Sequence, residues 1–160
     1  MKSVFEQIEN IINEELSNIN QKIKGTGFLE ILKFNLIENL SKKLTKLSFE
    51  NIEDSIKDCN FEDDFKKIST RIILCKSPKI QLNTKLNKNL LLICLNGSIK
   101  IDIEDFSTKK YINYNLIKNT GITLSKGLNC NINMLKNVLA LEIFHEDKNM
   151  DIENSKDNTI

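Results

Sequence analysis

The chain has 160 residues, which is enough for one domain that buries a sizeable core without crosslinks. It contains 22 lysines but one arginine, together with 22 asparagines, a bias typical of an AT-rich coding sequence, so lysine content alone is poor evidence for nucleic-acid binding. Net charge is −4 over residues 1–66, +8 over residues 67–145 and −3 over residues 146–160. This distribution favours docking of an acidic part on a basic part and leaves an anionic ligand open for the basic part.

The four cysteines, Cys59, Cys75, Cys94 and Cys130, form no CxxC pair, and three of them lie among apolar residues. We interpret them as reduced core thiols, which indicates a cytoplasmic protein. No uninterrupted apolar stretch approaches the roughly 20 residues that span a bilayer. Neither a signal peptide nor a membrane span is therefore predicted.

Two amphipathic helices are predicted at the start of the chain. Ser3 and Glu6 fit a capping box, and the apolar residues that follow repeat every 3.6 positions until Gly25 and Gly27. A second helix is expected over residues 28–47, with a leucine stripe that includes Leu36 on one side. The two stripes and the short glycine loop predict a helical hairpin. Residues 48–65 are expected to form short helical turns.

From residue 68 onward, β-branched and apolar runs alternate with turn signals, which is typical of an antiparallel sandwich or barrel. Eight strands are predicted, at residues 69–75, 79–82, 90–95, 98–104, 109–117, 121–124, 128–133 and 138–145. Asn96 and Gly97 are expected to form a two-residue type I′ turn of a hairpin. The last residues have few apolar anchors and are expected to be disordered.

The segments LLLICLNGSIKI (90–101), GITLSKGLNCNI (121–132) and VLALEIF (138–144) together resemble the cupin superfamily of jelly-roll barrels. The resemblance implies an α+β fold, in which an N-terminal helical hairpin precedes an antiparallel β jelly-roll barrel. We accordingly divide the chain into a helical segment (1–66), a cupin-like barrel (67–146) and a tail (147–160).

The residues that bind a metal in typical cupins have no counterpart in this sequence. In the family pattern, the glutamate position falls on Leu90, two histidine positions fall near Thr84 and Leu86, and the last histidine position falls on Cys130. None of these four is a usual ligand of the family's divalent metal. The resemblance therefore implies the barrel without a metal or other cofactor.

Three residues are candidates for a ligand site in the barrel interior, namely Cys130, Tyr111 and Tyr114. Cys130, Ile132 and Met134 alternate with asparagines, so the cysteine face is expected to point inward and the asparagines toward water, which predicts a dry interior. A catalytic Cys130 needs a histidine that activates its thiol, and His145 is the one histidine of the chain. We interpret His145 as a solvated residue at a strand end.

The sequence favours a metal-free binding or interaction module without a catalytic constellation. The alternative is a metal-independent enzyme, of isomerase or lyase type, acting on a small molecule in the barrel. A homodimer and a small-molecule ligand are the partners compatible with this interpretation, whereas a membrane is excluded. Nucleic acid is disfavoured, because aromatic residues interleave with basic ones only at residues 109–114.

Elemental analysis tests the metal-free interpretation. Because the four family positions carry no usual ligand, the purified, chelator-washed protein is expected to hold less than about 0.1 equivalent of zinc, iron or manganese per chain. One equivalent of any of these metals contradicts the prediction.

Overall fold

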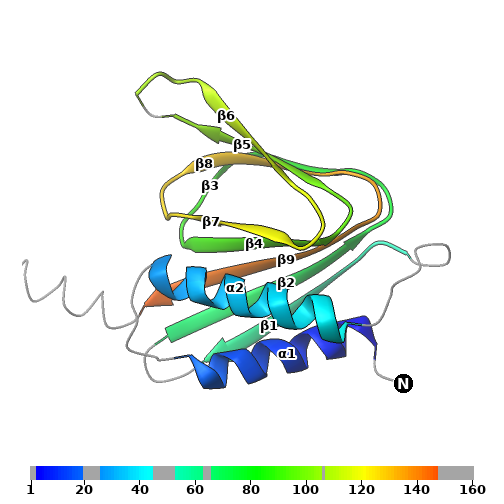
Figure 1. Cartoon of the computed structure of the whole chain (residues 1–160). Helices are drawn as coiled ribbons and strands as arrows, with labels where there is room; N and C mark the ends of the chain where they lie inside the picture. The colour runs from blue at the N-terminus through cyan, green and yellow to red at the C-terminus, as the bar shows by residue number, and fades with distance from the viewer. Residues whose placement is uncertain (1–2, 20–25, 45–52, 63–65, 106, 148–160) are drawn as a thin grey trace, which may run out of the picture.

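The computed structural model describes residues 3–19, 26–44, 53–62, 66–105 and 107–147, in which two helices precede nine strands (Figure 1). The helices are α1 (Val4–Asn18) and α2 (Thr26–Lys43). The strands are β1 (Ser55–Glu62), β2 (Lys66–Cys75), β3 (Lys79–Lys85), β4 (Asn89–Asn96), β5 (Ile99–Glu104), β6 (Tyr111–Leu116), β7 (Thr120–Leu124), β8 (Asn129–Met134) and β9 (Val138–Asp147).

The strands form two antiparallel sheets that face each other (Figure 1). Sheet A has the order β1-β2-β9-β4-β7, and sheet B has the order β3-β8-β5-β6. The predicted fold class, an α+β chain with a helical hairpin followed by an antiparallel jelly roll, is confirmed. The predicted barrel closure is wrong, because the sheets remain separate layers and no ladder joins their edge strands within the described residues.

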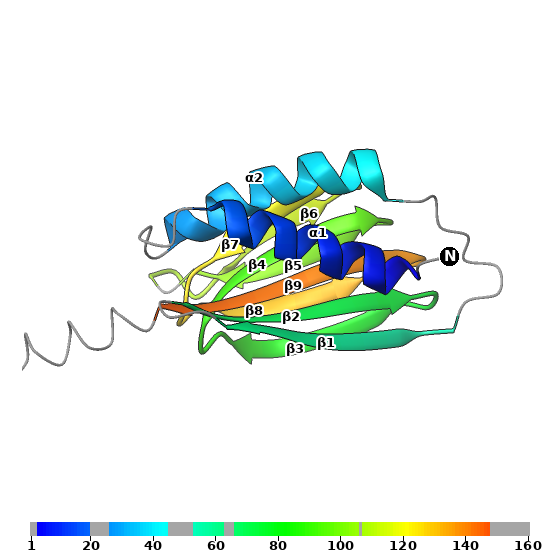
Figure 2. The ribbon, with the colours of Figure 1, turned by 90° about the horizontal axis from the view of Figure 1, so that it is seen from below.

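Both helices lie across the outer face of sheet A, as Figure 2 shows from below. Ser3 caps α1 by accepting a hydrogen bond from the backbone N–H of Glu6, at 3.2 Å. The leucine stripe of α2 is buried and packs with apolar residues of β2, β4 and β9. The members on these three strands are Ile68, Ile72, Leu74, Leu91, Ile93, Leu95, Leu139, Leu141 and Ile143. None of the described helices is long and apolar enough to cross a membrane.

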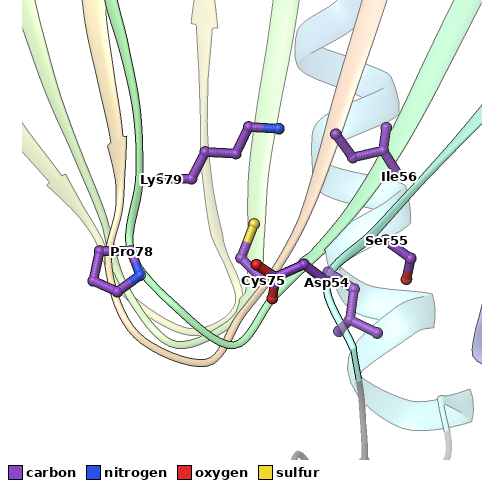
Figure 3. A pocket seen from close by; sticks show the side chains of 7 residues that line it. Asp54, Ser55, Ile56, Cys75, Pro78 and Lys79 are labelled. Atoms are coloured by element: carbon purple, nitrogen blue, oxygen red, sulfur yellow. The ribbon is translucent and has the colours of Figure 1, made fainter.

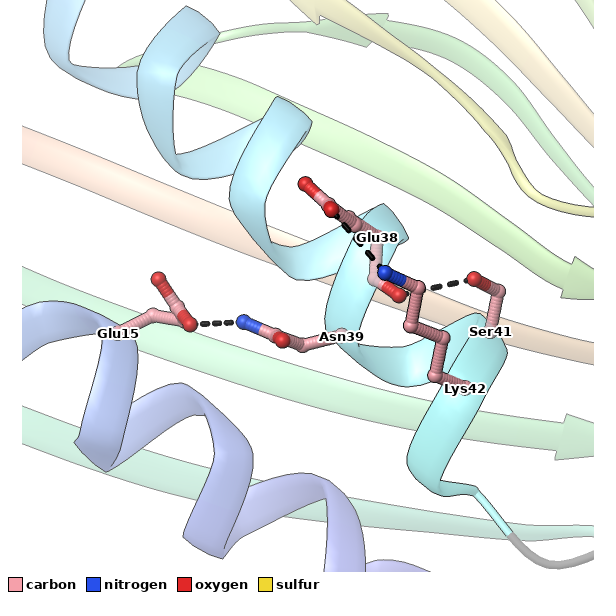
Figure 4. Close-up of polar contacts among 5 residues, drawn as sticks. All are labelled: Glu15, Glu38, Asn39, Ser41 and Lys42. Atoms are coloured by element: carbon pink, nitrogen blue, oxygen red, sulfur yellow. Dashed lines mark hydrogen bonds and ion pairs between the residues drawn. The ribbon is translucent and has the colours of Figure 1, made fainter.

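Polar contacts fix the helices relative to each other and to the sheet. The side chain of Asn39 in α2 donates a hydrogen bond to the buried carboxylate of Glu15 in α1 (Figure 4). Lys57 of β1 pairs with Glu9 of α1, which connects the first helix to the edge of sheet A. These contacts are directional, whereas apolar packing alone is not.

A second apolar cluster fills the space between the two sheets. It combines inward residues of β4 and β9 with Ile99, Ile101, Cys130, Ile132 and Met134 of sheet B. Strand β8 alternates as predicted, since its cysteine, isoleucine and methionine are buried and its asparagines are not. Strands β4 and β9 contribute to both clusters, so they are covered on both faces, by helices and by sheet B.

Strand β1 contradicts the prediction of helical turns over residues 48–65. Residues 55–62 pair with β2 in continuous antiparallel register, from Ser55 opposite Leu74 to Glu62 opposite Lys67. Pairing with a long neighbouring strand overrides the weak local pattern. The division into a helical segment (1–66), a barrel (67–146) and a tail stays a prediction, and residues 148–160 of the tail lie outside the described residues.

The expected hairpin at Asn96 and Gly97 is also wrong. The two strands that flank this turn, β4 and β5, belong to different sheets and do not pair. A type I′ turn requires positive φ at both of its central residues. Gly97 adopts φ +79°, but Asn96 is not among the described residues with positive φ. A Cβ on Gly97 would come within 2.6 Å of the Asn137 carbonyl oxygen, so this glycine allows the close passage of the chain from one sheet to the other.

The buried stripe of α2 is testable by charge insertion. Leu36 has no exposed surface, so Leu36→Asp is expected to lower the free energy of unfolding by more than about 3 kcal/mol, as measured by urea denaturation. Ser41→Asp is the control in the same helix, because Ser41 is exposed, and it is expected to change stability by less than about 1 kcal/mol. Equal stability of Leu36→Asp and wild type contradicts the packing described here.

Candidate functional site

A pocket of about 440 Å³ opens where the two sheets part, at the turn between β2 and β3 (Figure 3). The start of β1, the end of β2 and the start of β3 supply its walls, and β3 belongs to the opposite sheet from the other two. Its lining residues are Asp54, Ser55, Ile56, Leu74, Cys75, Pro78 and Lys79. The pocket is therefore a consequence of the open edge of the jelly roll.

The polar groups of this pocket are held by the local chain. Asp54 Oδ1 accepts a hydrogen bond from the backbone N–H of Lys76, at 2.6 Å, which ties the start of β1 to the turn after β2. Burial raises the pKa of the Cys75 thiol, the negative charge of Asp54 raises it further, and the positive charge of Lys79 opposes both. The thiol of Cys75 therefore stays protonated at neutral pH, which makes it a poor nucleophile.

Three charged residues form a row across the inner face of sheet A, beside the pocket. Asp58 of β1 opposes Arg71 of β2, and Arg71 opposes Glu142 of β9. Arg71 Nε donates to Asp58 Oδ1 at 3.3 Å. The row runs from solvent toward the centre of the sheet, because Asp58 is exposed, Arg71 is partly exposed and Glu142 is buried.

Glu142 is the charged residue most deeply placed between the sheets. Its residue surface is 2% exposed, and its Oε1 has no hydrogen-bond partner in the described part of the protein. Burial raises the pKa of its carboxyl group, while the positive charges of Arg71 and Lys79 lower it. The tip of Lys79 thus acts electrostatically on both the pocket cysteine and Glu142.

Sequence reasoning missed this group of residues. The available signal was a single glutamate in the run VLALEIF, since a charged residue in a strand buried on both faces rarely lacks a partner or a function. The single arginine of the chain, Arg71, is the cross-strand neighbour of that glutamate. That they are neighbours follows from the register between β2 and β9, which the sequence pattern does not contain.

Cys130 lies where the sequence predicts it, in the apolar interior on β8, and is 1% exposed. Burial raises the pKa of its thiol, and the charge of Glu142 raises it further. Both effects keep the thiol protonated at neutral pH. Leu86 and Leu90, which stand at the metal-ligand positions implied by the resemblance, belong to the same apolar cluster as Cys130.

The two tyrosines are partly exposed at the edge of sheet B. Tyr111 and Tyr114 lie on the edge strand β6, and each is 44% exposed. Tyr111 opposes Glu104 and Tyr114 opposes Ile101, so they project from opposite faces of sheet B. Tyr114 thus shares the inner face of sheet B with Ile101, whereas Tyr111 lies on the outer face, and their role as ligand contacts stays a prediction.

His145 also differs from the prediction. It is 1% exposed, and its ring lies 4.9 Å from that of Phe28, at an angle of 32°, on the helix side of sheet A. The solvated strand-end interpretation is wrong because α2 covers this end of β9. Cys130 lies on the opposite side of sheet A, so these two residues do not form a Cys–His pair.

The described residues contain no group of three or more His, Cys, Asp or Glu side chains arranged as a metal site would be. The family positions at Leu90 and Cys130 are occupied by residues of the apolar cluster. The absence of a metal cofactor stays a prediction, which elemental analysis decides.

Glu142 predicts a pH-dependent stability. Its pKa is raised above the ordinary 4.5, so the folded state binds a proton more readily than the unfolded state, and stability falls as pH rises from about 4.5 through the folded-state pKa. Glu142→Met is therefore expected to raise the free energy of unfolding by about 1–3 kcal/mol at pH 8 and by less at pH 4. Urea denaturation at both pH values measures this difference, with Glu104→Met on the outer face as control. An equal effect of Glu142→Met at both pH values contradicts a raised pKa of Glu142 in the folded state.

Comparison with known proteins gives no family model and no curated protein that matches this sequence. Solved structures with a similar fold include the Schizosaccharomyces pombe Cnp3 cupin domain, which is 10% identical, with 71% of this chain and 81% of that chain covered and a TM-score of 0.44. A cupin superfamily protein from Desulfitobacterium hafniense is 15% identical, with 60% and 82% covered and a TM-score of 0.43. Drosophila melanogaster CENP-C bound to CAL1 is 12% identical, with 56% and 81% covered and a TM-score of 0.43.

These likenesses concern the fold alone. The fold agrees with the resemblance found in the sequence. It has two facing antiparallel sheets, and the strands within residues 90–101 and 121–144 belong to them. The protein has a cupin-like jelly-roll fold, with two helices on its outer face.

Proposed function

We propose that this protein is a metal-free, non-enzymatic binding module that takes a small molecule at the open edge of its jelly roll. The observation that carries this proposal is the pocket between β1, β2 and β3. Its volume of about 440 Å³ is in the range of small-molecule sites, roughly 300–1,000 Å³. Its walls combine apolar residues such as Ile56 and Pro78 with two charged groups, Asp54 and Lys79, as such sites usually do.

The packing between the sheets supports a site at the edge rather than in the centre. Leucine, isoleucine, methionine and cysteine side chains fill the described interior around Cys130. A polar ligand at the centre would lose its hydrogen bonds to water without replacement, which is unfavourable. At the edge, in contrast, partly exposed Lys79 offers a charge that is still accessible.

A metal-independent enzyme is the second candidate function, and Glu142 is the observation that favours it. A buried carboxyl group with a raised pKa suits a general acid or base. The state of the other residues expected to take part in catalysis, Cys130 and the two tyrosines, argues against this candidate. The Cys130 thiol stays protonated, and the two tyrosines are exposed on opposite faces of sheet B.

A homodimer in the cytoplasm is part of the same proposal. Ile31 and Phe34 of α2 are 40% and 70% exposed on the helical layer, and exposed apolar side chains of this kind are common in subunit contacts. Size-exclusion chromatography with light scattering on wild type and Phe34→Asp measures the mass in solution.

A thermal-shift screen of small metabolites, with a pocket-filling variant, tests the proposed function. Ile56→Trp narrows the pocket, and Ile80→Trp is the matched control, because Ile80 is 61% exposed and lines no part of it. A ligand at 100 times its Kd stabilises the folded state by about 2.7 kcal/mol, which raises Tm by roughly 5–10 °C for a chain of this size.

We expect this shift in wild type and Ile80→Trp and its loss in Ile56→Trp. A screen without any stabilising compound, or a shift that Ile56→Trp leaves unchanged, contradicts the proposed site. Turnover of a stabilising compound, detected by mass spectrometry, would favour the enzyme.

A further inference from the structure

Strand β6 is an edge of sheet B that carries no charged residue. Sheet B ends at β3 on one side and at β6 on the other, and no strand of the described residues pairs with the outer side of β6 (Figure 1). Its six residues, YINYNL, also include no proline, and five of the six are exposed. An edge strand of this kind presents backbone N–H and C=O groups to which another strand can add.

The other three edge strands have protection that β6 lacks. Strand β3 contains lysines and a shift of register against β8. Strand β1 carries charged side chains, of which Lys57 pairs with Glu9 of α1. Strand β7 has five residues and lies against α2, since Thr123 donates a hydrogen bond to Glu30. Charges, bulges, short strands and covering helices are the usual means of preventing contact between sheet edges. Their absence from β6 indicates that this edge has a partner.

Strand β6 also exposes apolar side chains on the inner face of sheet B. Ile112 and Tyr114 lie opposite Ile103 and Ile101 of β5, on the face that packs toward sheet A. They are nevertheless 47% and 44% exposed. Sheet A therefore covers this face only in part at β6, and an apolar strip continues to the edge.

The backbone groups that face the open side of β6 belong to its odd-numbered residues. The carbonyl oxygen of Lys110 accepts a hydrogen bond from the N–H of Asp105 across the β5–β6 hairpin, at 2.7 Å. In an antiparallel pair, residues that bond to the neighbouring strand alternate with residues whose backbone groups point the other way. Ile112 and Tyr114 follow Lys110 in this alternation, so Asn113 directs its N–H and C=O away from β5.

We propose that β6 is a contact between two copies of this chain, which pair antiparallel with Asn113 on the twofold axis and join their two B sheets into one. Opposed residues then share a face, and Ile112 of each copy lies opposite the Tyr114 of the other. Pairs of an aromatic and a β-branched residue are favourable across strands. An axis at Tyr114 would instead place Lys110 opposite the second copy's Lys118, and like charges in that position are unfavourable.

This contact is self-complementary, which is what a twofold dimer requires. It rests on the proposed homodimer and names a surface for it other than the exposed side of α2. A strand pair of this length buries less than the roughly 1,600 Å² of a standard interface. We therefore expect a Kd of about 1–100 μM.

Sedimentation velocity over about 1–300 μM protein tests the contact, and we expect the mass to rise from one chain to two across this range. Asn113→Pro removes the N–H that faces the second copy and keeps the hydrogen bonds to β5. Because the twofold axis doubles the loss, this variant is expected to weaken the dimer by about tenfold or more. Asn113→Ala keeps the N–H and is the matched control, which is expected to dimerise like wild type.

Thiol cross-linking tests the register. Asn113→Cys places two thiols opposite each other on the axis, with Cα atoms about 5.5 Å apart, a separation that a disulfide spans. Asn115→Cys is the matched control, because the residue opposite it is the second copy's Tyr111. Mild oxidation is expected to give a covalent dimer for Asn113→Cys alone. Wild type, whose four cysteines are buried or half-buried, is expected to stay uncrosslinked.

The outcomes separate this contact from the proposed homodimer. If wild type stays monomeric over the whole range, both are wrong. If Phe34→Asp abolishes the dimer and a folded Asn113→Pro does not, the homodimer stands with its contact on α2, and the β6 contact is wrong. Equal cross-linking of Asn113→Cys and Asn115→Cys also contradicts the proposal. Circular dichroism and Tm verify that each variant is folded, and the cross-linking decides if Asn113→Pro is not.

Discussion

The structure depends on the burial of sheet A on both faces. Strands β4 and β9 present apolar side chains to the helices on one side and to sheet B on the other. Each large apolar side chain that is fully buried contributes about 1.5–3 kcal/mol, so neither face can be left to solvent. The helical hairpin is therefore part of the core of the fold, because it covers a surface that a jelly roll of this composition would otherwise expose.

This two-sided burial also gives Glu142 its significance. A carboxylate in an ordinary half-exposed strand would turn to water, but β9 has no solvent-facing side at this position. The residue is retained with one oxygen unsatisfied, in reach of the electrostatic influence of Arg71 and Lys79. Proteins commonly hold such unfavourable groups at binding or catalytic sites, where stability is lost in favour of function.

The open edge of the jelly roll is the second constraint on function. Because β1 and β3 belong to different sheets and do not pair, the described structure has an accessible recess there. The chemistry that a cupin would place around Leu90 and Cys130 is replaced by apolar packing. Asp54 and Lys79 line the recess instead, and Arg71 lies between Asp58 and Glu142 on the inner face of sheet A.

The sequence by itself determined the elements from β2 to β9, because strand alternation and turn residues are local signals. It also determined that Cys130 faces inward, since a period of two assigns faces within a strand. Only the tertiary structure decided that β1 is a strand, that the Asn96–Gly97 turn connects two sheets, and that α2 buries His145. The same holds for Glu142, because strand register places Arg71 beside it and sheet packing brings it under the electrostatic influence of Lys79, although both lie about 60–70 positions away in the sequence. Periodicity indicates which residues of a strand share a face. Which residues pack against that face depends on distant strands, and the tertiary structure decides it.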